Sequence, residues 1–136
     1  NVRLGDPETQ VILPRLKTDL VTAILAVVEG GLGHFSMRWD QRNAVTVVMA
    51  AKGYPGTYSK GSEIRGLTAA ARREDTLIFH AGTMITPDGI VQANGGRVLA
   101  VTGLGADADS ARQTAYDAIA AIDWPDGFFR TDIAKS

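Results

Sequence analysis

The first ten residues, NVRLGDPETQ, combine side chains that could act together on a phosphate. An asparagine side-chain oxygen can bind Mg²⁺, and Arg3 would project to the same side of an extended strand as Asn1. A guanidinium placed there could clamp a phosphate or an acyl phosphate. Asn1 is therefore a candidate metal ligand and Arg3 a candidate catalytic, phosphate-stabilising residue. The alternative is a plain strand, turn and N-capped helix in which Arg3 pairs with Asp6 or Glu8.

Two glycine-rich loops, each with one cation, are further candidates for anion binding. They are Lys52–Gly56 and Asn94–Arg97. Glycines let backbone N–H groups approach an anion, and a neighbouring cation could bind a phosphate. The predicted substrate-binding residues are Lys52, Gly95, Gly96 and Arg97. The alternative for both loops is a turn whose glycines adopt positive φ and whose cation is solvated.

The cysteine, histidine and remaining glycine patterns of the sequence do not predict a further site. The sequence has no cysteine, which excludes disulfides, thiolate metal sites and a cysteine nucleophile. His34 and His80 have no second imidazole at ligand spacing, so we expect no zinc site and a structural, hydrogen-bonded His80. The string Gly103–Ala108 fits a dinucleotide fingerprint, but Asp107 would place a carboxylate beside a pyrophosphate. We predict a turn and a helix cap there instead.

Composition and charge restrict the partners. The 136 residues are 45% hydrophobic and 21% charged, which is typical of a globular domain. The formal net charge of −1 gives no long-range field to attract nucleic acid or an anionic membrane. The most apolar stretch, Leu20–Val28, is far shorter than the about 20 residues that span a bilayer. We expect no nucleic-acid or membrane partner, and the lack of cysteine is compatible with a cytoplasmic location.

The N-terminal region has a helical pattern with a break. Asp6 is a candidate N-cap, Pro7 suits the first helical position, and Pro14 interrupts the pattern. This predicts a short helix over 7–13 and a second helix over 17–29. The second helix is apolar on more than one face, so we expect it to lie between two layers.

From residue 43 onward the pattern changes to strands. Continuous or β-branched runs predict strands over 44–50, 76–80, 89–92 and 97–102, with a hairpin turn at 87–89. Because the strands are short and closely connected, we expect antiparallel pairing. A last helix over 108–122, capped by Asp107 or Asp109, should pack on the sheet. The predicted fold class is α+β.

Several strings in this sequence, taken in order, resemble one family. The first string, Arg3–Gln10, looks like the signature of the phosphoribosylamine–glycine ligase family, also called glycinamide ribonucleotide synthetases. The other matching strings, in the family's order, are Lys52–Gly56, Phe79–Thr83, Asn94–Leu99 and Phe129–Ile133. The resemblance therefore covers nearly the whole chain.

The resemblance implies an ATP-grasp ligase of purine synthesis that joins glycine to 5-phospho-D-ribosylamine through a glycyl phosphate. ATP would be the co-substrate, and Mg²⁺ or Mn²⁺ the metal. The family's Glu-x-Asn-x-Arg pattern holds the metal with Glu and Asn and contacts the transferring phosphate with Arg. Asn1 and Arg3 match its second half, whereas the Glu would lie two positions before Asn1. Asp6 and Glu8 would support Arg3 and cap the helix rather than react.

By the same resemblance, residues 1–40 look like the helical tail of the ATP-grasp domain. Residues 43–136 look like the family's small C-terminal domain, an antiparallel β-rich, barrel-sandwich-like unit with one packed helix. The nucleotide-binding region of the family lies upstream, so we expect this chain to be cut from a longer one whose N-terminal portion is its partner. The isolated chain should neither bind ATP tightly nor catalyse ligation.

Two other classes of function stay open from the sequence alone. One is a stand-alone small-molecule binding or regulatory module built on the β-rich unit. The other is an interaction domain whose apolar helix over 17–29 docks a partner chain.

Overall fold

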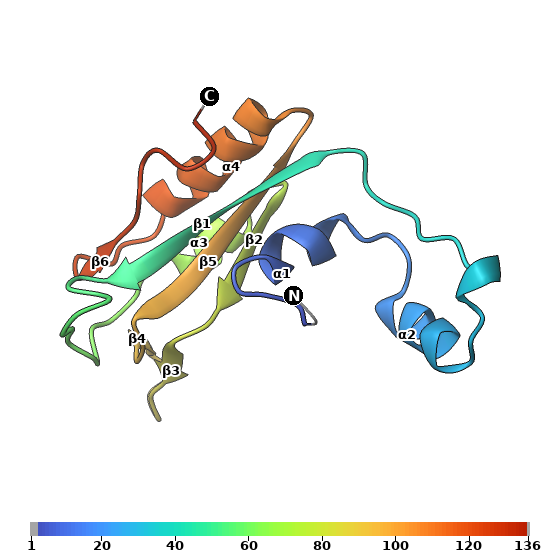
Figure 1. Cartoon of the computed structure of the whole chain (residues 1–136). Helices are drawn as coiled ribbons and strands as arrows, with labels where there is room; N and C mark the ends of the chain where they lie inside the picture. The colour runs from blue at the N-terminus through green and yellow to red at the C-terminus, as the bar shows by residue number, and fades with distance from the viewer. Residues whose placement is uncertain (1–2, 136) are drawn as a thin grey trace.

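The computed structural model describes residues 3–135 and has an α+β fold (Figure 1). Strands β1 (Asn43–Ala51), β2 (Thr76–His80), β5 (Arg97–Gly105) and β6 (Gly127–Phe128) form one antiparallel sheet in the order β2-β5-β1-β6. Strands β3 (Thr83–Ile85) and β4 (Val91–Ala93) form a separate antiparallel hairpin. The α+β class and the antiparallel pairing are confirmed. The four-stranded sheet is open within the described residues, and the barrel-sandwich-like packing stays a prediction.

The central pair of strands alternates its side chains between two covered faces. Val45, Val47 and Met49 of β1 are buried on one face, whereas Thr46 and Val48 are half-buried on the other. β5 is buried along nearly its whole length because it lies between β1 and β2 and is covered on both faces. Both strands extend beyond the predicted ranges, and β5 includes the glycines of the string over 103–108.

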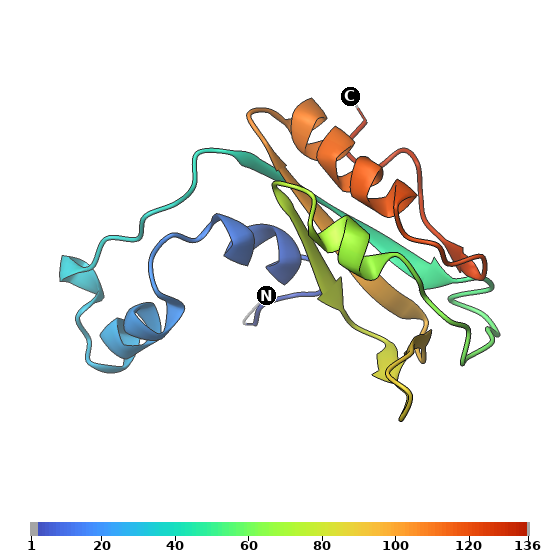
Figure 2. The same ribbon diagram turned by 180° about the vertical axis from the view of Figure 1, so that it is seen from behind.

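The predicted C-terminal helix is confirmed as α4 (Ala108–Ala120). It begins after Asp107, whose carboxylate accepts a hydrogen bond from the Ser110 N–H at 2.7 Å. α4 and α3 (Leu67–Ala71) cover the same face of the sheet (Figure 2). A Cβ atom at Gly103 would lie 2.3 Å from the carbonyl oxygen of Ala111. The string therefore packs a helix closely on a strand. The predicted helix cap at Asp107 is confirmed, whereas Gly103 and Gly105 lie in β5 rather than in a turn.

The N-terminal segment lies on the opposite face of the sheet. There α1 (Thr9–Ile12) continues into a 3₁₀ turn, η1 (Leu13–Arg15). The hydroxyl of Thr102, a fully buried residue of β5, donates to the backbone carbonyl of Gln10 at 2.9 Å. This hydrogen bond holds α1 against the sheet, since it satisfies a polar group that would otherwise be buried without a partner.

The prediction of a helix that starts at Pro7 under an Asp6 cap was wrong. α1 begins at Thr9 after Glu8, and no side chain caps it. Gly5 supplies the contacts instead: its N–H donates to the Glu8 carboxylate at 3.2 Å, and its carbonyl accepts from the Thr9 N–H at 2.9 Å. Asp6 does not cap α1; its carboxylate accepts from the side-chain amide of Gln10 in that helix at 2.8 Å and also contacts a residue of β5 described below.

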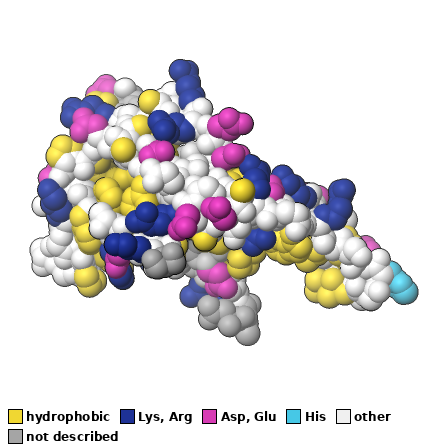
Figure 3. Space-filling model, turned by 90° about the horizontal axis from the view of Figure 1, so that it is seen from above, with side chains coloured by type: hydrophobic (Ala, Val, Ile, Leu, Met, Phe, Trp, Pro, Cys, Tyr) yellow, Lys and Arg dark blue, Asp and Glu magenta, His cyan; other side chains and the backbone are white. Residues whose placement is uncertain are grey.

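The second N-terminal helix, α2 (Leu20–Val28), is shorter than predicted and begins after Asp19, whose carboxylate accepts from the Thr22 N–H at 2.7 Å. It lies away from the sheet, together with the 3₁₀ turn η2 (Leu32–His34) (Figure 1). Figure 3 shows hydrophobic side chains on the surface of this projecting arm. Val21 is 62% exposed and Val28 77% exposed. The expectation that this helix lies between two layers was therefore wrong for residues 3–135.

The hairpin turn predicted at 87–89 is confirmed between β3 and β4, where Gly89 has a φ of +82° and its N–H donates to the Thr86 carbonyl. Strand β3, helix α3 and the two-residue β6 were not predicted. Among residues 3–135, no helix combines the length and the hydropathy that a membrane span needs.

Candidate functional site

Four of the five strings that carry the family resemblance meet at one end of the sheet. The Cα atom of Gly95 lies 2.7 Å from the position of a Cβ built on Gly82, so the loops over 79–83 and 94–97 touch backbone to backbone. A Cβ on Gly96 would lie 2.2 Å from the ring of Tyr54 in the third loop. Arg97 then joins these loops to the first string by contacts with Asp6.

Asp6 and Arg97 form the central contact of this corner. The Nη2 atom of Arg97 lies 3.1 Å from Oδ2 of Asp6, and Nη1 donates to the Asp6 carbonyl oxygen at 3.2 Å. The second Asp6 oxygen accepts from the side-chain amide of Gln10 at 2.8 Å. The guanidinium is therefore held toward the N-terminal segment, and because Arg97 is 43% exposed it can still bind an anion.

The glycines of this corner have a packing role. Gly95 and Gly96 are not among the residues with positive φ, and each lies where a side chain would overlap a neighbour. Gly53, in contrast, has a φ of +96° within a turn closed by the Tyr54 N–H and the Ala51 carbonyl. The turn interpretation therefore fits the loop over 52–56, whereas close approach of the backbone explains Gly95 and Gly96.

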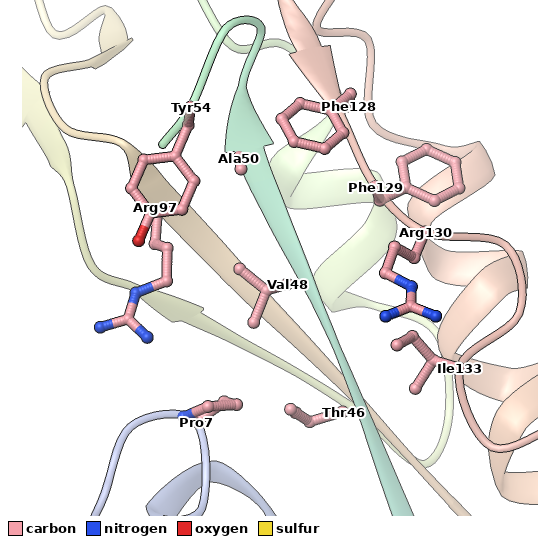
Figure 4. Close-up of a pocket in the computed structure, with 10 residues that line it drawn as sticks. All are labelled: Pro7, Thr46, Val48, Ala50, Tyr54, Arg97, Phe128, Phe129, Arg130 and Ile133. Atoms are coloured by element: carbon pink, nitrogen blue, oxygen red, sulfur yellow. The ribbon is translucent and has the colours of Figure 1, made fainter. Parts of the chain in front are cut away.

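An apolar cavity of about 280 Å³ opens on the face of the sheet that carries α1 (Figure 4). Thr46, Val48 and Ala50 of β1 form its floor, as Figure 4 shows. Arg97 stands on one side of the cavity and Arg130 on the other. The remaining lining residues are Pro7, Tyr54, Phe128, Phe129 and Ile133. The cavity thus offers an apolar surface between two cations, an arrangement suited to an anion with an apolar or planar part.

The C-terminal tail that supplies Arg130 is fastened to α4. The Arg112 guanidinium donates to the carbonyl oxygens of Ile133 at 2.9 Å and Thr131 at 2.6 Å, and the Tyr116 hydroxyl donates to the Arg130 carbonyl at 2.6 Å. Arg130 itself pairs with Asp132 at 2.6 Å, and this hydrogen bond lowers the pKa of the Asp132 carboxyl. Sequence analysis missed Arg112 and Tyr116, because no local pattern marks a helix residue that binds a tail.

A second cavity, of about 340 Å³, lies between the first string and β2. Its walls combine polar and apolar side chains from both segments. They are Leu4, Gly5, Asp6, Thr9, Gln10, Leu13, Phe79 and His80. His80 is exposed, and its Nδ1 lies 3.0 Å from the Thr83 hydroxyl, so the prediction of a hydrogen-bonded histidine is confirmed.

The remaining predicted site residues that the structure describes do not contact Asp6 or Arg97 through their side chains. Arg3 is exposed, and its guanidinium donates to the adjacent Leu4 carbonyl at 3.2 Å rather than to Asp6 or Glu8. Lys52 donates to the Pro125 carbonyl at 2.6 Å and lines neither cavity. Asn1 lies outside the described residues. Glu8 accepts from Gly5 and so shapes the turn before α1.

Residues 3–135 contain no group of three or more His, Cys, Asp or Glu side chains that could hold a metal ion. The role of Asn1 as a metal ligand stays a prediction.

A charged cluster at Asp40, which sequence analysis missed, fixes the start of β1 to the N-terminal segment. Asp40 is only 9% exposed and lies 2.9 Å from the Lys17 ammonium and 2.8 Å from the Arg42 guanidinium. Arg42 also pairs with Asp75. The hydrogen bonds from Arg42, followed by the one from Lys17, hold the pKa of the Asp40 carboxyl well below its usual range. This cluster positions the segment that carries α1 and the first string.

Comparison with known proteins gives a consistent result. The family model described as "Phosphoribosylglycinamide synthetase, C domain" matches residues 44–136. A phosphoribosylamine--glycine ligase of Mesorhizobium japonicum is 56% identical over 133 residues, which are 98% of this chain and 31% of that protein. The "Phosphoribosylamine--glycine ligase, chloroplastic" of Arabidopsis thaliana is 50% identical over 134 residues, which are 98% of this chain and 25% of that protein.

Among solved structures, a phosphoribosylamine--glycine ligase from Thermotoga maritima matches with a TM-score of 0.73 and 39% identity, over 98% of this chain and 32% of that one. The chain thus spans between a quarter and a third of the length of these relatives. The resemblance found in the sequence is confirmed.

Proposed function

Since the chain belongs to the phosphoribosylglycinamide synthetase C-domain family, we propose that it is the C-terminal portion of an ATP-dependent phosphoribosylamine–glycine ligase. The glycine carboxylate attacks the γ-phosphorus of ATP, and ADP leaves as the new O–P bond forms. The amine nitrogen of 5-phospho-D-ribosylamine then attacks the carbonyl carbon of glycyl phosphate. Phosphate leaves, the nitrogen loses a proton, and glycinamide ribonucleotide is the product.

The observation that carries this proposal is the contact between Asp6 and Arg97, at 3.1 Å. It connects the string that contains Arg3 with the glycine-rich loop of the C-terminal unit. In the proposed reaction, Arg3 stabilises charge on the transferring phosphate, and Arg97 with the loop of Gly95 and Gly96 binds the ribose phosphate. Phosphoryl transfer to a carboxylate needs this kind of charge neutralisation more than it needs an acid or a base.

Lys52 is the second cation proposed to reach the phosphate, although it lines neither cavity in this structure. Its ammonium donates to the Pro125 carbonyl in this structure, and it would exchange that bond for a phosphate oxygen. Gly95 and Gly96 support the proposal indirectly, because they let Gly82 and the Tyr54 ring pack against the loop that leads into Arg97. Asp6 and Glu8 have supporting roles, Asp6 by orienting Arg97 and Glu8 by shaping the turn after Arg3.

We infer that Mg²⁺ or Mn²⁺ neutralises phosphate charge in the complete enzyme. Asn1 would be one ligand, and a carboxylate two positions earlier would be another, as in the family pattern.

The proposal also covers the organisation of the complete protein. Residues 1–40 are the tail of the ATP-grasp domain, and residues 43–136 are the C-terminal domain. The exposed apolar side chains of α2 support this division, because a helix of that composition needs a cover that residues 3–135 do not supply. The N-terminal portion of the same protein is the expected partner, the expected location is the cytoplasm, and no nucleic-acid or membrane partner is expected.

The test is an assay of the complete protein with glycine, ATP and 5-phospho-D-ribosylamine. We expect ADP release only when both other substrates are present, and a loss of kcat of at least about 100-fold in Arg3→Ala. The 136-residue chain alone should show no micromolar ATP binding by calorimetry. Glycine-independent ADP release by the complete protein, or full turnover by Arg3→Ala, would reject the proposal.

A further inference from the structure

The C-terminal tail forms one side of the cavity that lies between Arg97 and Arg130. The tail follows β6 and contains no helix or strand over residues 129–135. Phe129, Arg130 and Ile133 of the tail line the cavity, and Arg130 stands on the side opposite Arg97 (Figure 4). A segment without regular backbone hydrogen bonds keeps one shape only where other groups hold it. The position of the Arg130 side chain therefore depends on what holds the tail.

Two side chains one turn apart on α4 hold the tail by its backbone. The Tyr116 hydroxyl donates to the Arg130 carbonyl at 2.6 Å and accepts from the Ile133 N–H at 3.3 Å. The Arg112 guanidinium donates to the carbonyls of Ile133 and Thr131. Its Cζ atom also lies 4.6 Å from the centroid of the Tyr116 ring, so the two side chains support each other.

Apolar packing of the tail does not by itself orient Arg130. Phe129 and Ile133 pack against the core, and the centroid of the Phe129 ring lies 6.1 Å from that of Tyr116. Apolar contact has no directional preference. Hydrogen bonds require a defined angle at the donor. The hydrogen bonds from Arg112 and Tyr116 therefore set the direction in which the Arg130 side chain leaves the backbone.

The Arg130 guanidinium keeps donors for an anion although it is paired. Its Nε and Nη2 atoms donate to the Asp132 carboxylate at 2.9 Å and 2.6 Å. Nη1 carries two further N–H groups. Arg130 lines the cavity, whereas Asp132 does not. An anion in the cavity can therefore bind Arg130 without displacing Asp132.

We propose that Arg112 and Tyr116 are positioning residues, which hold Arg130 at the cavity wall opposite Arg97 so that the phosphorylated substrate binds between two fixed cations. The inference rests on the proposed function, in which Arg97 binds the phosphate of 5-phospho-D-ribosylamine. Neither Arg112 nor Tyr116 lines the cavity, so both act through the tail backbone. A cation that is already held in place loses less conformational freedom when the substrate binds.

The first test is Tyr116→Phe in the complete enzyme, since this variant loses only the hydroxyl and keeps the ring beside Arg112 and Phe129. We expect the KM for the ribosylamine to rise about 3-fold to 10-fold, the value of one hydrogen bond. The kcat and the KM for glycine and for ATP should change less than about twofold. The matched control is Tyr58→Phe, because Tyr58 also packs against the core but does not line the cavity. That variant should leave all three KM values unchanged.

Arg112→Lys tests the other half of the attachment. Lysine keeps the positive charge beside the Tyr116 ring but lacks the planar fork that reaches two carbonyls at once. We expect the KM for the ribosylamine to rise by a similar factor, again with little change in kcat. An unchanged KM in either Arg112→Lys or Tyr116→Phe would remove that residue from the positioning role.

A double-mutant cycle separates positioning from a general effect on stability. In Arg130→Met no guanidinium is left to position, so adding Tyr116→Phe should change the KM for the ribosylamine less than about twofold. A hydroxyl that only stabilises the fold would have the same effect with and without Arg130. An equal rise in KM in both backgrounds would therefore overturn the inference.

The failure of this inference is distinguishable from the failure of the proposed function. If the complete protein makes no glycinamide ribonucleotide, the proposed function fails. If it is active, but the two α4 variants leave the KM for the ribosylamine unchanged or act independently of Arg130, only the positioning role is overturned.

Discussion

Arg97 and Asp6 are separated by 91 positions in the chain, and the Arg97 guanidinium contacts both the carboxylate and the backbone carbonyl of Asp6. This double contact fixes the orientation of the guanidinium more firmly than a single exposed ion pair could. It also sets the distance between the start of β5 and the string that carries Arg3. A change at either residue should therefore act on substrate binding and leave the core of the sheet intact.

Charge reversal at Arg97 tests its proposed role. In the complete enzyme we expect Arg97→Glu to raise the KM for 5-phospho-D-ribosylamine by about 10-fold to 100-fold, the value of a lost charge-assisted hydrogen bond, because a carboxylate repels the phosphate. The KM for glycine should change much less. The control is Arg73→Glu, since Arg73 follows α3 on the other face of the sheet. An unchanged KM for the ribosylamine would remove Arg97 from the site.

Gly96→Ala tests the packing of the loops at this corner. The added Cβ would lie 2.2 Å from the Tyr54 ring, so either the ring or the loop must move. We expect the free energy of unfolding to fall by about 1–3 kcal/mol, measured by urea denaturation of the chain. Gly33→Ala is the control, because a Cβ there meets nothing within 4 Å. Equal stability of the two variants would show that Gly96 has no packing role.

The Asp40 cluster should make stability depend on pH on the acid side. The folded-state pKa of Asp40 lies below its ordinary value of 3.8. Its stabilising contribution is therefore complete above that ordinary value and is lost as the pH falls toward the folded-state pKa. We expect Asp40→Asn to lower stability at neutral pH and to flatten the loss below about pH 4, whereas Asp88→Asn in an exposed turn should change neither. Unfolding midpoints measured between about pH 2.5 and 7 decide the question, and parallel profiles for wild type and Asp40→Asn would contradict it.

Local sequence patterns predicted the helices and strands whose buried side chains recur at a regular spacing. The helix stripe of Ala111, Ala115 and Ile119 and the alternation of Val45 and Val47 in β1 both face one continuous core. Helix α3 and strand β6, with five and two residues, have too few positions to show a period. Contacts between residues distant in the sequence determine where these short elements form. Gly66, before α3, has a φ of +79° and lies against the Ala121 carbonyl.

The sequence marked Asp6 and Arg97 as candidates for the site but did not mark them as partners. Arg97 and Asp6 were both candidates, yet nothing in the sequence indicates that the partner of Asp6 is Arg97 rather than Arg3. That pairing depends on the fold, because the Asp6 carboxylate lies between Gln10 of α1 and Arg97 of β5. The side-chain oxygen of Gln10, which is buried and has no hydrogen-bond partner within residues 3–135, was not predicted either. Burial without a partner is a property of the folded structure and leaves no local sequence pattern.

The projecting helix α2 leads to a prediction about the chain in solution. Val21 is 62% exposed, Val28 is 77% exposed, and each large aliphatic side chain that becomes buried is worth about 1.5–3 kcal/mol. We therefore expect the 136-residue chain to self-associate, and light scattering at increasing concentration should show a rising mean mass. Val28→Glu should shift this curve toward the monomer, because burying a carboxylate is unfavourable. Ser59→Glu adds the same charge at an exposed position away from α2 and should leave the curve unchanged. A clean monomer at high concentration would show that these side chains do not drive association.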